Sequence, residues 1–145
     1  ASFELLVRRS LQKIPAPFQI DSYQVKVVRS RPSARETSHA TISVRIGKKI
    51  QKTSAKGDGP VNALDAALRQ ALLPSFPALK KMKLIDYKVR IVSSRGGTAA
   101  RIRVLVESSD GTREWGTVGV SSNILEASAL ALTDSLSYFL LPRGT

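Results

Sequence analysis

The stretch YQVKVVRS, Tyr23 to Ser30, returns with few changes as YKVRIVSS, Tyr87 to Ser94. In both, basic and apolar side chains alternate, which is typical of a β-strand with one buried and one solvated face. Two more pairs of stretches follow in the same order and at similar spacing: ATISVRI (40–46) with ARIRVLV (100–106), and NALDAAL (62–68) with NILEASAL (123–130). The sequence therefore predicts an internal duplication, in which Tyr23 is matched with Tyr87, Ala40 with Ala100 and Asn62 with Asn123.

Each half of the duplication is predicted to form three strands followed by a helix. In the first half the expected strands are 23–29, 40–46 and 48–55, and the helix is 60–72. In the second half the expected strands are 87–93, 100–108 and 113–120, and the helix is 123–139. The pair Asp110–Gly111 is typical of a hairpin turn. The predicted fold class is α+β, a two-layer arrangement of two pseudo-symmetric βββα units.

The N-terminal segment is predicted to precede this duplicated part. Residues 2–11 have the pattern of a short amphipathic helix, and IPAPF (14–18) ends it, because proline stops helices. We therefore divide the chain into a linker helix with a proline-containing linker, residues 1–17, and a domain, residues 18–145. The repeats are expected at about 18–75 and 82–141. The polar segment 29–38 is expected to be a mobile loop, with His39 beside it.

The composition excludes several classes of protein. The 145 residues include no cysteine, so a disulfide framework and a thiolate metal cluster are excluded. No apolar run approaches the roughly 18 residues that a membrane-spanning helix needs, and the first residues are too charged for a signal peptide. We expect a cytoplasmic domain without membrane contact.

The net charge is the most unusual feature of the composition: 23 Lys and Arg residues against 11 Asp and Glu residues give a net charge of +12. Such a balance favours polyanionic partners, so a basic nucleic-acid-binding module is one hypothesis. The basic residues alternate with apolar ones instead of clustering, and aromatic residues make up only 6% of the chain. A sheet that reads RNA presents aromatic side chains for base stacking, so a solvated basic face is the favoured interpretation.

The stretch KGDGPVNALDAALRQAL (56–72) places two glycines directly before a helix. It lacks the Lys-Ser/Thr pair of a P-loop and the third glycine of a dinucleotide fingerprint. Pro60 suits the first helical position, and the exposed helix start could hold a carboxylate or a phosphate. A plain turn with a cap is the alternative. In the second half Ser122 or Asn123 could cap the helix, and Asp65 and Glu126 are expected to be first-turn charges.

No catalytic constellation is evident in the sequence. His39 is the single histidine, whereas a metal site or a histidine-based catalytic pair needs further partners. We therefore expect that this chain alone is not an enzyme, has no catalytic residues and binds no metal or other cofactor.

Four ordered motifs resemble one known family: GDGPVNALDAALR, LIDYKVRI, GGTAARIRVLVESSDG and EWGTVGVSSNILEAS. Together they are similar to the C-terminal regulatory domain of the 2-isopropylmalate synthase and citramalate synthase family, and ESSDG with WGTVGVSSNI is closer to the citramalate synthase branch. The similarity covers about residues 18–141. One departure is Ala129, where the family commonly has tryptophan.

The resemblance implies a homodimer with feedback inhibition by isoleucine, or by leucine in the 2-isopropylmalate synthase branch. It also implies a catalytic TIM barrel in the same polypeptide, with a divalent metal, that transfers an acetyl group from acetyl-CoA to pyruvate. Nucleic acid is not an expected partner of such a domain. Leu84 and Tyr87 could instead be core residues, and Gly96–Gly97 could be a simple turn. The effector residues implied by the family are Gly59, Val61, Asn62, Leu84, Tyr87, Ile91, Gly97, Thr98, Ala99, Ser122 and Ile124.

Overall fold

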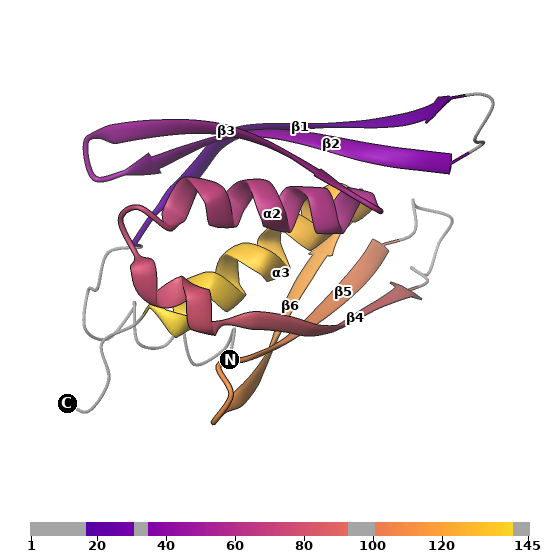
Figure 1. Cartoon of the computed structure of the whole chain (residues 1–145). Coiled ribbons are helices and arrows are strands. Elements are labelled where there is room, and N and C mark those ends of the chain that lie inside the picture. Colours follow the sequence, from indigo (N-terminus) through magenta and orange to yellow (C-terminus); the bar gives the residue numbers. More distant parts are fainter. Residues whose placement is uncertain (1–16, 31–34, 93–100, 141–145) are drawn as a thin grey trace. The chain divides into compact units, whose positions relative to one another are not determined.

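The computed structural model describes residues 17–30, 35–92 and 101–140, which form two compact units. The first unit is Pro17–Leu79 and the described part of the second begins at Lys80. Each unit consists of a three-stranded antiparallel sheet with one helix along one of its faces (Figure 1). The predicted α+β fold with two βββα units is confirmed. The expected linker helix lies outside the described residues.

In the first unit β1 (Gln19–Ser30), β2 (Arg35–Ile46) and β3 (Lys49–Gly57) are neighbours in that order. Helix α2 (Pro60–Leu72) follows, and a short 3-10 helix, η1 (Pro77–Lys81), leads to the second unit. The predicted bounds of α2 are confirmed. Helix η1 was not predicted, because so short a segment cannot show a hydrophobic period.

In the second unit β4 (Lys83–Val92), β5 (Arg101–Ser109) and β6 (Glu114–Ser121) have the same order, and α3 (Ile124–Phe139) completes it. The predicted hairpin turn at Asp110 is confirmed. The Asp110 carboxylate accepts hydrogen bonds from the backbone N–H groups of Thr112 and Arg113, and Gly111 has a positive φ of 95°. Glycine adopts this conformation without the steric cost that other residues have.

The core of each unit lies between the sheet and its helix. Residues directly opposite one another on neighbouring strands share a face of the sheet. Ala40, Ile42 and Val44 of β2 are buried under α2, which presents Ala63, Leu64, Ala67, Leu68, Ala71 and Leu72. Val104 and Val106 of β5 are buried under α3, which presents Ala127, Ala131, Leu132 and Leu136.

Within the described parts of all three strands, a residue of the first unit and its equivalent in the second unit are separated by one constant distance along the sequence. Tyr23 pairs with Ile42, which pairs with Thr53. In the second unit Tyr87 pairs with Val106, which pairs with Thr117. The predicted duplication is therefore present. The match of Asn62 with Asn123 is wrong, because Asn62 is the third residue of α2 whereas Asn123 precedes α3 as its N-cap. The match of Ala40 with Ala100 involves a residue outside the described part of the chain.

One hydrogen bond fixes the helix on the sheet in both units. Thr53 Oγ1 donates to the carbonyl oxygen of Ala67 at 2.7 Å, and Thr117 Oγ1 donates to that of Ala131 at 2.7 Å. Each bond ties the third strand of a unit to the middle of its helix. The repeated bond supports the correspondence of the units independently of the strand pairing.

Two local predictions are wrong. The expected mobile loop 29–38 is strand at both ends, because Arg29 pairs with Glu36, and His39 lies within β2; residues 31–34 lie outside the described part. Asp65 is the sixth residue of α2 and not a first-turn charge, whereas Glu126 is in the first turn of α3 as predicted.

No helix among the described residues is long and apolar enough to cross a membrane.

Candidate functional site

The start of α2 is held close to its own sheet and carries no side-chain cap. Gly59 is the N-cap residue with extended backbone angles, and Pro60 follows at the first helical position. A Cβ atom on Gly57 would lie 2.5 Å from the backbone nitrogen of Ala63, so glycine allows strand and helix to approach this closely. The helix start therefore leaves backbone N–H groups that no side chain of the cap satisfies. The expected effector residues Gly59 and Val61 are partly buried here, and Asn62 is exposed.

The start of α3 is capped, which distinguishes the two units. Asn123 Oδ1 accepts hydrogen bonds from the N–H groups of Leu125 and Glu126, so of the two predicted capping residues Asn123 is the cap. Ser122 is exposed beside it. Asn62, which has the same letter in the aligned stretch, is the third residue of α2 and has a different position. Because Asn123 occupies two of its N–H groups, α3 offers fewer donors to an anion.

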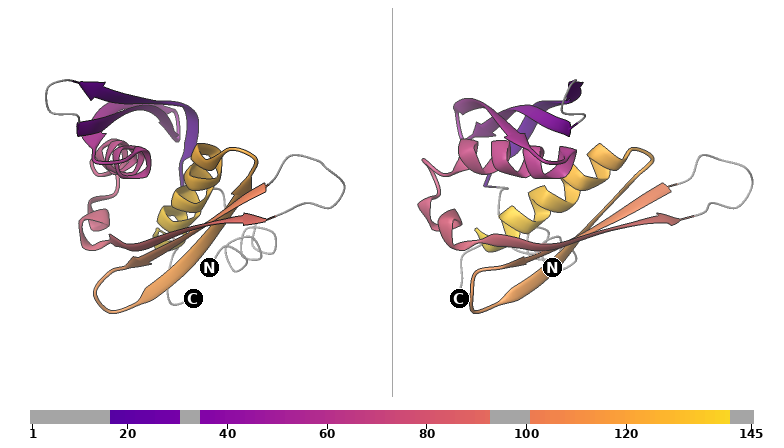
Figure 2. Two further views of the ribbon diagram at one scale, coloured as in Figure 1. Left: turned by 90° about the vertical axis from the view of Figure 1, so that its right-hand side faces the viewer. Right: turned by 45° about the vertical axis from the view of Figure 1, so that its right-hand side comes forward.

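The side of β4 that faces the helix layer is largely uncovered. Tyr87, Val89 and Ile91, which we call the β4 strip, pair with Val106, Val104 and Ile102 and therefore share the face on which α3 packs. Helix α3 packs against β5 and β6, and Figure 2 shows the ends of β4 and β5 extending beyond it. Val89 is 40% exposed and Ile91 is 74% exposed. An aliphatic surface thus lies beside the capped start of α3, where Ile124 is 43% exposed.

A chain of two hydrogen bonds connects the β4 strip to the first turns of α3. The hydroxyl groups of Tyr87 and Ser128 are 2.9 Å apart, and Ser128 Oγ donates to the carbonyl oxygen of Ile124 at 2.7 Å. Tyr87 is partly buried and Ser128 is fully buried. Two of the expected effector residues, Tyr87 and Ile124, are therefore brought together. Ser128 was not singled out from the sequence, although a serine within an apolar helix segment is the signal that could have found it.

Leu84 and Ile91 lie at opposite ends of β4. A register shift between Leu84 and Asp86 brings Leu84 onto the same face as Tyr87, and Leu84 pairs with Ser108. The extended strand between them places Leu84 about 20 Å from Ile91, which is more than one free amino acid can span. Ile20 and Ser22 show the equivalent shift in β1. The three remaining effector residues, Gly97, Thr98 and Ala99, lie outside the described residues.

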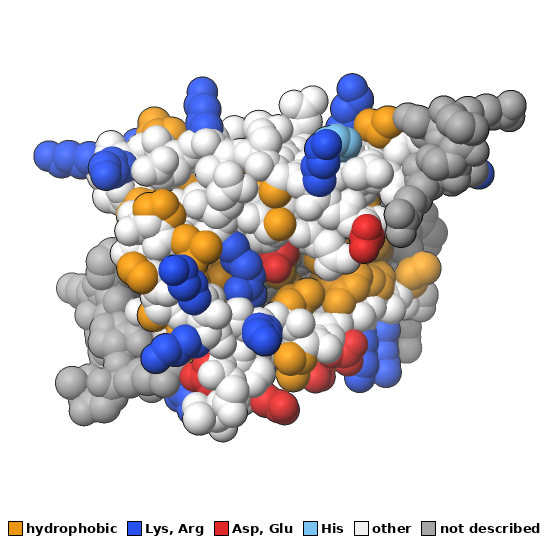
Figure 3. All heavy atoms as spheres, viewed as in Figure 1, with side chains coloured by type: hydrophobic (Ala, Val, Ile, Leu, Met, Phe, Trp, Pro, Cys, Tyr) orange, Lys and Arg blue, Asp and Glu red, His pale blue; other side chains and the backbone are white. Residues whose placement is uncertain are grey.

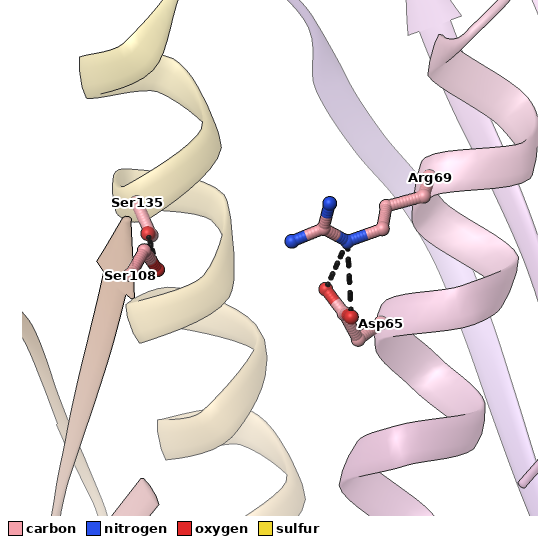
Figure 4. A network of polar contacts seen from close by, with 4 residues as sticks. All are labelled: Asp65, Arg69, Ser108 and Ser135. Atoms are coloured by element: carbon pink, nitrogen blue, oxygen red, sulfur yellow. Dashed lines mark hydrogen bonds and ion pairs between the residues drawn. The ribbon is translucent and has the colours of Figure 1, made fainter. Parts of the chain in front are cut away.

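A partly buried ion pair lies along α2 (Figure 4). Arg69 Nε donates to both carboxylate oxygens of Asp65, at 3.0 and 3.1 Å. Burial raises the pKa of the Asp65 carboxyl above its usual value, and the charge of Arg69 and its hydrogen bond act in the opposite direction. Asp65 and Arg69 neutralise each other's charge within α2, so we assign to them a role in stabilising the fold and not in binding a ligand.

A second buried polar contact joins β5 to α3. The hydroxyl groups of Ser108 and Ser135 are 2.6 Å apart and point toward one another in Figure 4. Trp115 Nε1 donates to the carbonyl oxygen of Ser135 at 3.2 Å, and its ring stacks on Phe139 at 5.7 Å between centroids. The contacts satisfy the buried polar groups of this core, so we assign them to the fold and not to a site.

Many basic side chains of the strands lie on the outer faces of the sheets. Lys26, His39 and Lys56 are directly opposite one another across the first sheet. On the second sheet Lys88, Arg90 and Arg103 line a shallow concavity of about 260 Å³ with Leu105 and Val118. Figure 3 shows Lys and Arg side chains scattered over the visible face, without one continuous patch.

The aromatic residues of the strands lie on the opposite faces from these basic residues. Tyr23, Tyr87 and Trp115 all pair with residues of the helix-facing sides. In the described part of both sheets, the basic outer face therefore has no aromatic side chain on which a base could stack. Nor do the described residues include three or more His, Asp or Glu grouped so as to hold a metal ion.

The chain consists of tandem βββα units, and the second unit presents an exposed aliphatic strip of the kind that marks a ligand-binding or association surface. The family model described as the LeuA allosteric (dimerisation) domain matches residues 1–140, and the chain belongs to this family.

Several relatives are similar over nearly the whole chain. It is 50% identical over 140 residues to (R)-citramalate synthase of Geobacter sulfurreducens and 47% identical over 141 residues to that of Aquifex aeolicus. These alignments cover 97% of this chain and 26% and 27% of the relatives. A more distant relative, 2-isopropylmalate synthase of Methanocaldococcus jannaschii, is 33% identical over 104 residues, 72% of this chain and 18% of the relative. The chain thus spans about a quarter of the length of the citramalate synthases it matches.

Proposed function

We propose that this chain is the effector-binding and dimerising part of a citramalate synthase, and that isoleucine is its feedback effector. The observation that carries the proposal is the higher identity to (R)-citramalate synthases than to 2-isopropylmalate synthase over the family domain. Isoleucine is the end product that the resemblance implies for the citramalate synthase branch. The proposed activity of the whole protein, acetyl transfer to pyruvate with a divalent metal, belongs to a catalytic barrel outside this domain.

The aliphatic surface of the second unit supports an aliphatic ligand. Val89, Ile91 and Ile124 are exposed apolar side chains, and burying such surface against a branched side chain is favourable by about 25 cal/mol per Å². Tyr87 supplies a polar atom within this surface. Isoleucine and leucine differ only in the position of a methyl group, so a hydrophobic site discriminates between them by about 1–3 kcal/mol.

The start of α2 supports binding of a carboxylate in its own unit. The N-terminus of a helix favours anions through its free N–H groups and its dipole. Gly59 contributes no capping side chain there. We retain Gly59, Val61 and Asn62 as proposed effector residues, and Gly97, Thr98, Ala99 and Ser122 as residues proposed from the family alone. Because Leu84 is distant from Ile91 along β4, we centre the aliphatic contacts on Ile91.

Homodimer formation is the second element of the proposal. The matched family is described as a dimerisation domain, and closed twofold dimers are the commonest homo-oligomers. We expect sedimentation at about 100 µM, which is far above a micromolar dissociation constant and thus saturates any dimer held by about −8 kcal/mol or more, to give the mass of two chains. A species that stays monomeric at that concentration would contradict this element.

Calorimetric titration of this chain with L-isoleucine and with L-leucine tests the effector. We expect isoleucine to bind about tenfold or more tightly than leucine, within the discrimination available to an apolar site. Equal affinities would contradict the choice of isoleucine, and binding of neither would contradict the proposed function. The same titration at low and high salt should change little, whereas contacts with nucleic-acid phosphates weaken steeply with salt.

A further inference from the structure

The direction of the proton on the Tyr87 hydroxyl follows from its two-bond chain. Ser128 Oγ is 2.7 Å from the carbonyl oxygen of Ile124, and a carbonyl oxygen can only accept. The single proton of the Ser128 hydroxyl is therefore used in that bond. The contact of 2.9 Å between Ser128 Oγ and Tyr87 Oη then requires that Tyr87 donates.

We propose that Ser128 is a positioning residue that accepts the hydrogen bond donated by the Tyr87 hydroxyl, so that the Tyr87 oxygen can only accept a hydrogen bond from a ligand and receives the ammonium group of the bound amino acid. This inference rests on the proposed function, because it concerns the same ligand. With its proton directed to Ser128, the Tyr87 oxygen presents only lone pairs to a ligand on the β4 strip. A ligand ammonium can donate to it, whereas a ligand carboxylate cannot be accommodated there without losing a hydrogen bond.

The neighbours of Tyr87 also favour an ammonium group over a carboxylate at this position. Val89 and Ile91 follow it along the same face of β4, and neither offers a competing polar side chain. Lys88 and Arg90 lie between them on the opposite face, where they line the outer concavity. Once an aliphatic ligand covers the strip, the ammonium is removed from water and needs an acceptor, because a buried donor without a partner is costly.

The test compares two ligands and three variants in calorimetric titrations. The ligands are L-isoleucine and 3-methylpentanoate, which has the same carbon skeleton and carboxylate but no ammonium. The variants are Tyr87→Phe, Ser128→Ala and the control Ser137→Ala. Ser137 is also a fully buried serine of α3, and its hydroxyl has no hydrogen-bond partner among the described residues. Competition against isoleucine gives the affinity of 3-methylpentanoate if direct titration is too weak.

We expect the Tyr87 and Ser128 variants to lose affinity for isoleucine but not for 3-methylpentanoate. Tyr87→Phe should lower the affinity for isoleucine about tenfold or more, the effect of losing one hydrogen bond to a charged group. Ser128→Ala should lower it about threefold, because the freed hydroxyl can still accept part of the time. In both variants the affinity for 3-methylpentanoate should stay within about twofold of that of the unaltered chain, because this ligand has no ammonium group to donate to Tyr87. Ser137→Ala should leave both ligands unchanged.

Two results would overturn the inference while leaving the proposed function intact. One is an unchanged affinity for isoleucine in Tyr87→Phe. The other is an equal loss for both ligands, which would make the role of the two residues structural. If the unaltered chain binds neither ligand, the proposed function itself fails, and this inference fails with it.

Discussion

Gly119→Ala should strongly destabilise the second unit, because Gly119 is where β6 touches α3. A Cβ atom at this position would collide with the carbonyl oxygen of Ala127 and lie 2.9 Å from the backbone nitrogen of Ala131. Both are helix backbone atoms, so neither can rotate away as a side chain would. The helix must therefore move away from the sheet, and the contacts of its buried face loosen together.

The magnitude follows from that displacement. A gap of about 0.5–1 Å forfeits roughly a quarter to a half of the dispersion energy of each contact, and overpacked cores lose about 1–3 kcal/mol or more. We expect the free energy of unfolding to fall by about 3 kcal/mol, which corresponds to a decrease in Tm of about 10 °C for a chain of this size. Urea denaturation followed by circular dichroism measures the change.

The matched control is Gly116→Ala, which makes the same substitution in the same strand. Its Cβ would lie 3.5 Å from Leu105 Cδ1, an ordinary van der Waals contact. We expect a change within about 0.5 kcal/mol, since reduced freedom of the unfolded chain offsets any small strain. If the two variants had equal stabilities, the close contact between β6 and α3 would be wrong, and with it the packing of the second unit.

Three further predictions concern the helices. Thr117→Val and Thr53→Val should each lower the free energy of unfolding by about 1–2 kcal/mol, because each removes the hydrogen bond from the third strand to the helix of its unit. A decrease in only one of the two variants would contradict the structural equivalence of the units. Asn123→Ala should lower the free energy of unfolding by about 1 kcal/mol, because the cap is lost. Gly59→Ala removes no cap bond, and the reduced freedom of the unfolded chain offsets the poorer fit of alanine at an N-cap, so we expect a change of at most about 0.5 kcal/mol. Because the pKa of Asp65 is raised in the folded state, its contribution is greatest below the unfolded pKa and is lost as the pH rises through the folded value. The stability of the unaltered chain relative to Asp65→Asn should therefore increase as the pH is lowered, and a difference that does not vary with pH would contradict the raised pKa.

The alternation of basic and apolar residues was sufficient to predict the strands and the fold class. It failed at strand ends such as Arg35 to Ser38, where polar residues are held by pairing with β1 and have no hydrophobic period of their own. It also failed at η1, which depends on the burial of one side chain, Leu79. The true match between the two units could be established only from strand register, because similar letters such as Asn62 and Asn123 occupy different helix positions.

The candidate site was predictable in its residue types but not in its connections. Tyr87 and Ile124 were named from the family resemblance, and the structure links them through Ser128. That link depends on the packing of α3 against the sheet, which has no signature in a linear pattern. The separation of Leu84 from Ile91 likewise follows from the extended geometry of β4, and the family resemblance, which supplied only the identities of the residues, could not predict it.

The most direct test of the proposed effector site is an NMR titration of the isotopically labelled chain with L-isoleucine. The predicted result is saturable shifts of backbone amide signals that centre on Tyr87, Ile91 and the first turns of α3. Shifts confined to the outer faces of the sheets would contradict the proposed site. So would the absence of shifts at about 1 mM isoleucine, a concentration that half-saturates a site with a binding free energy of only about −4 kcal/mol.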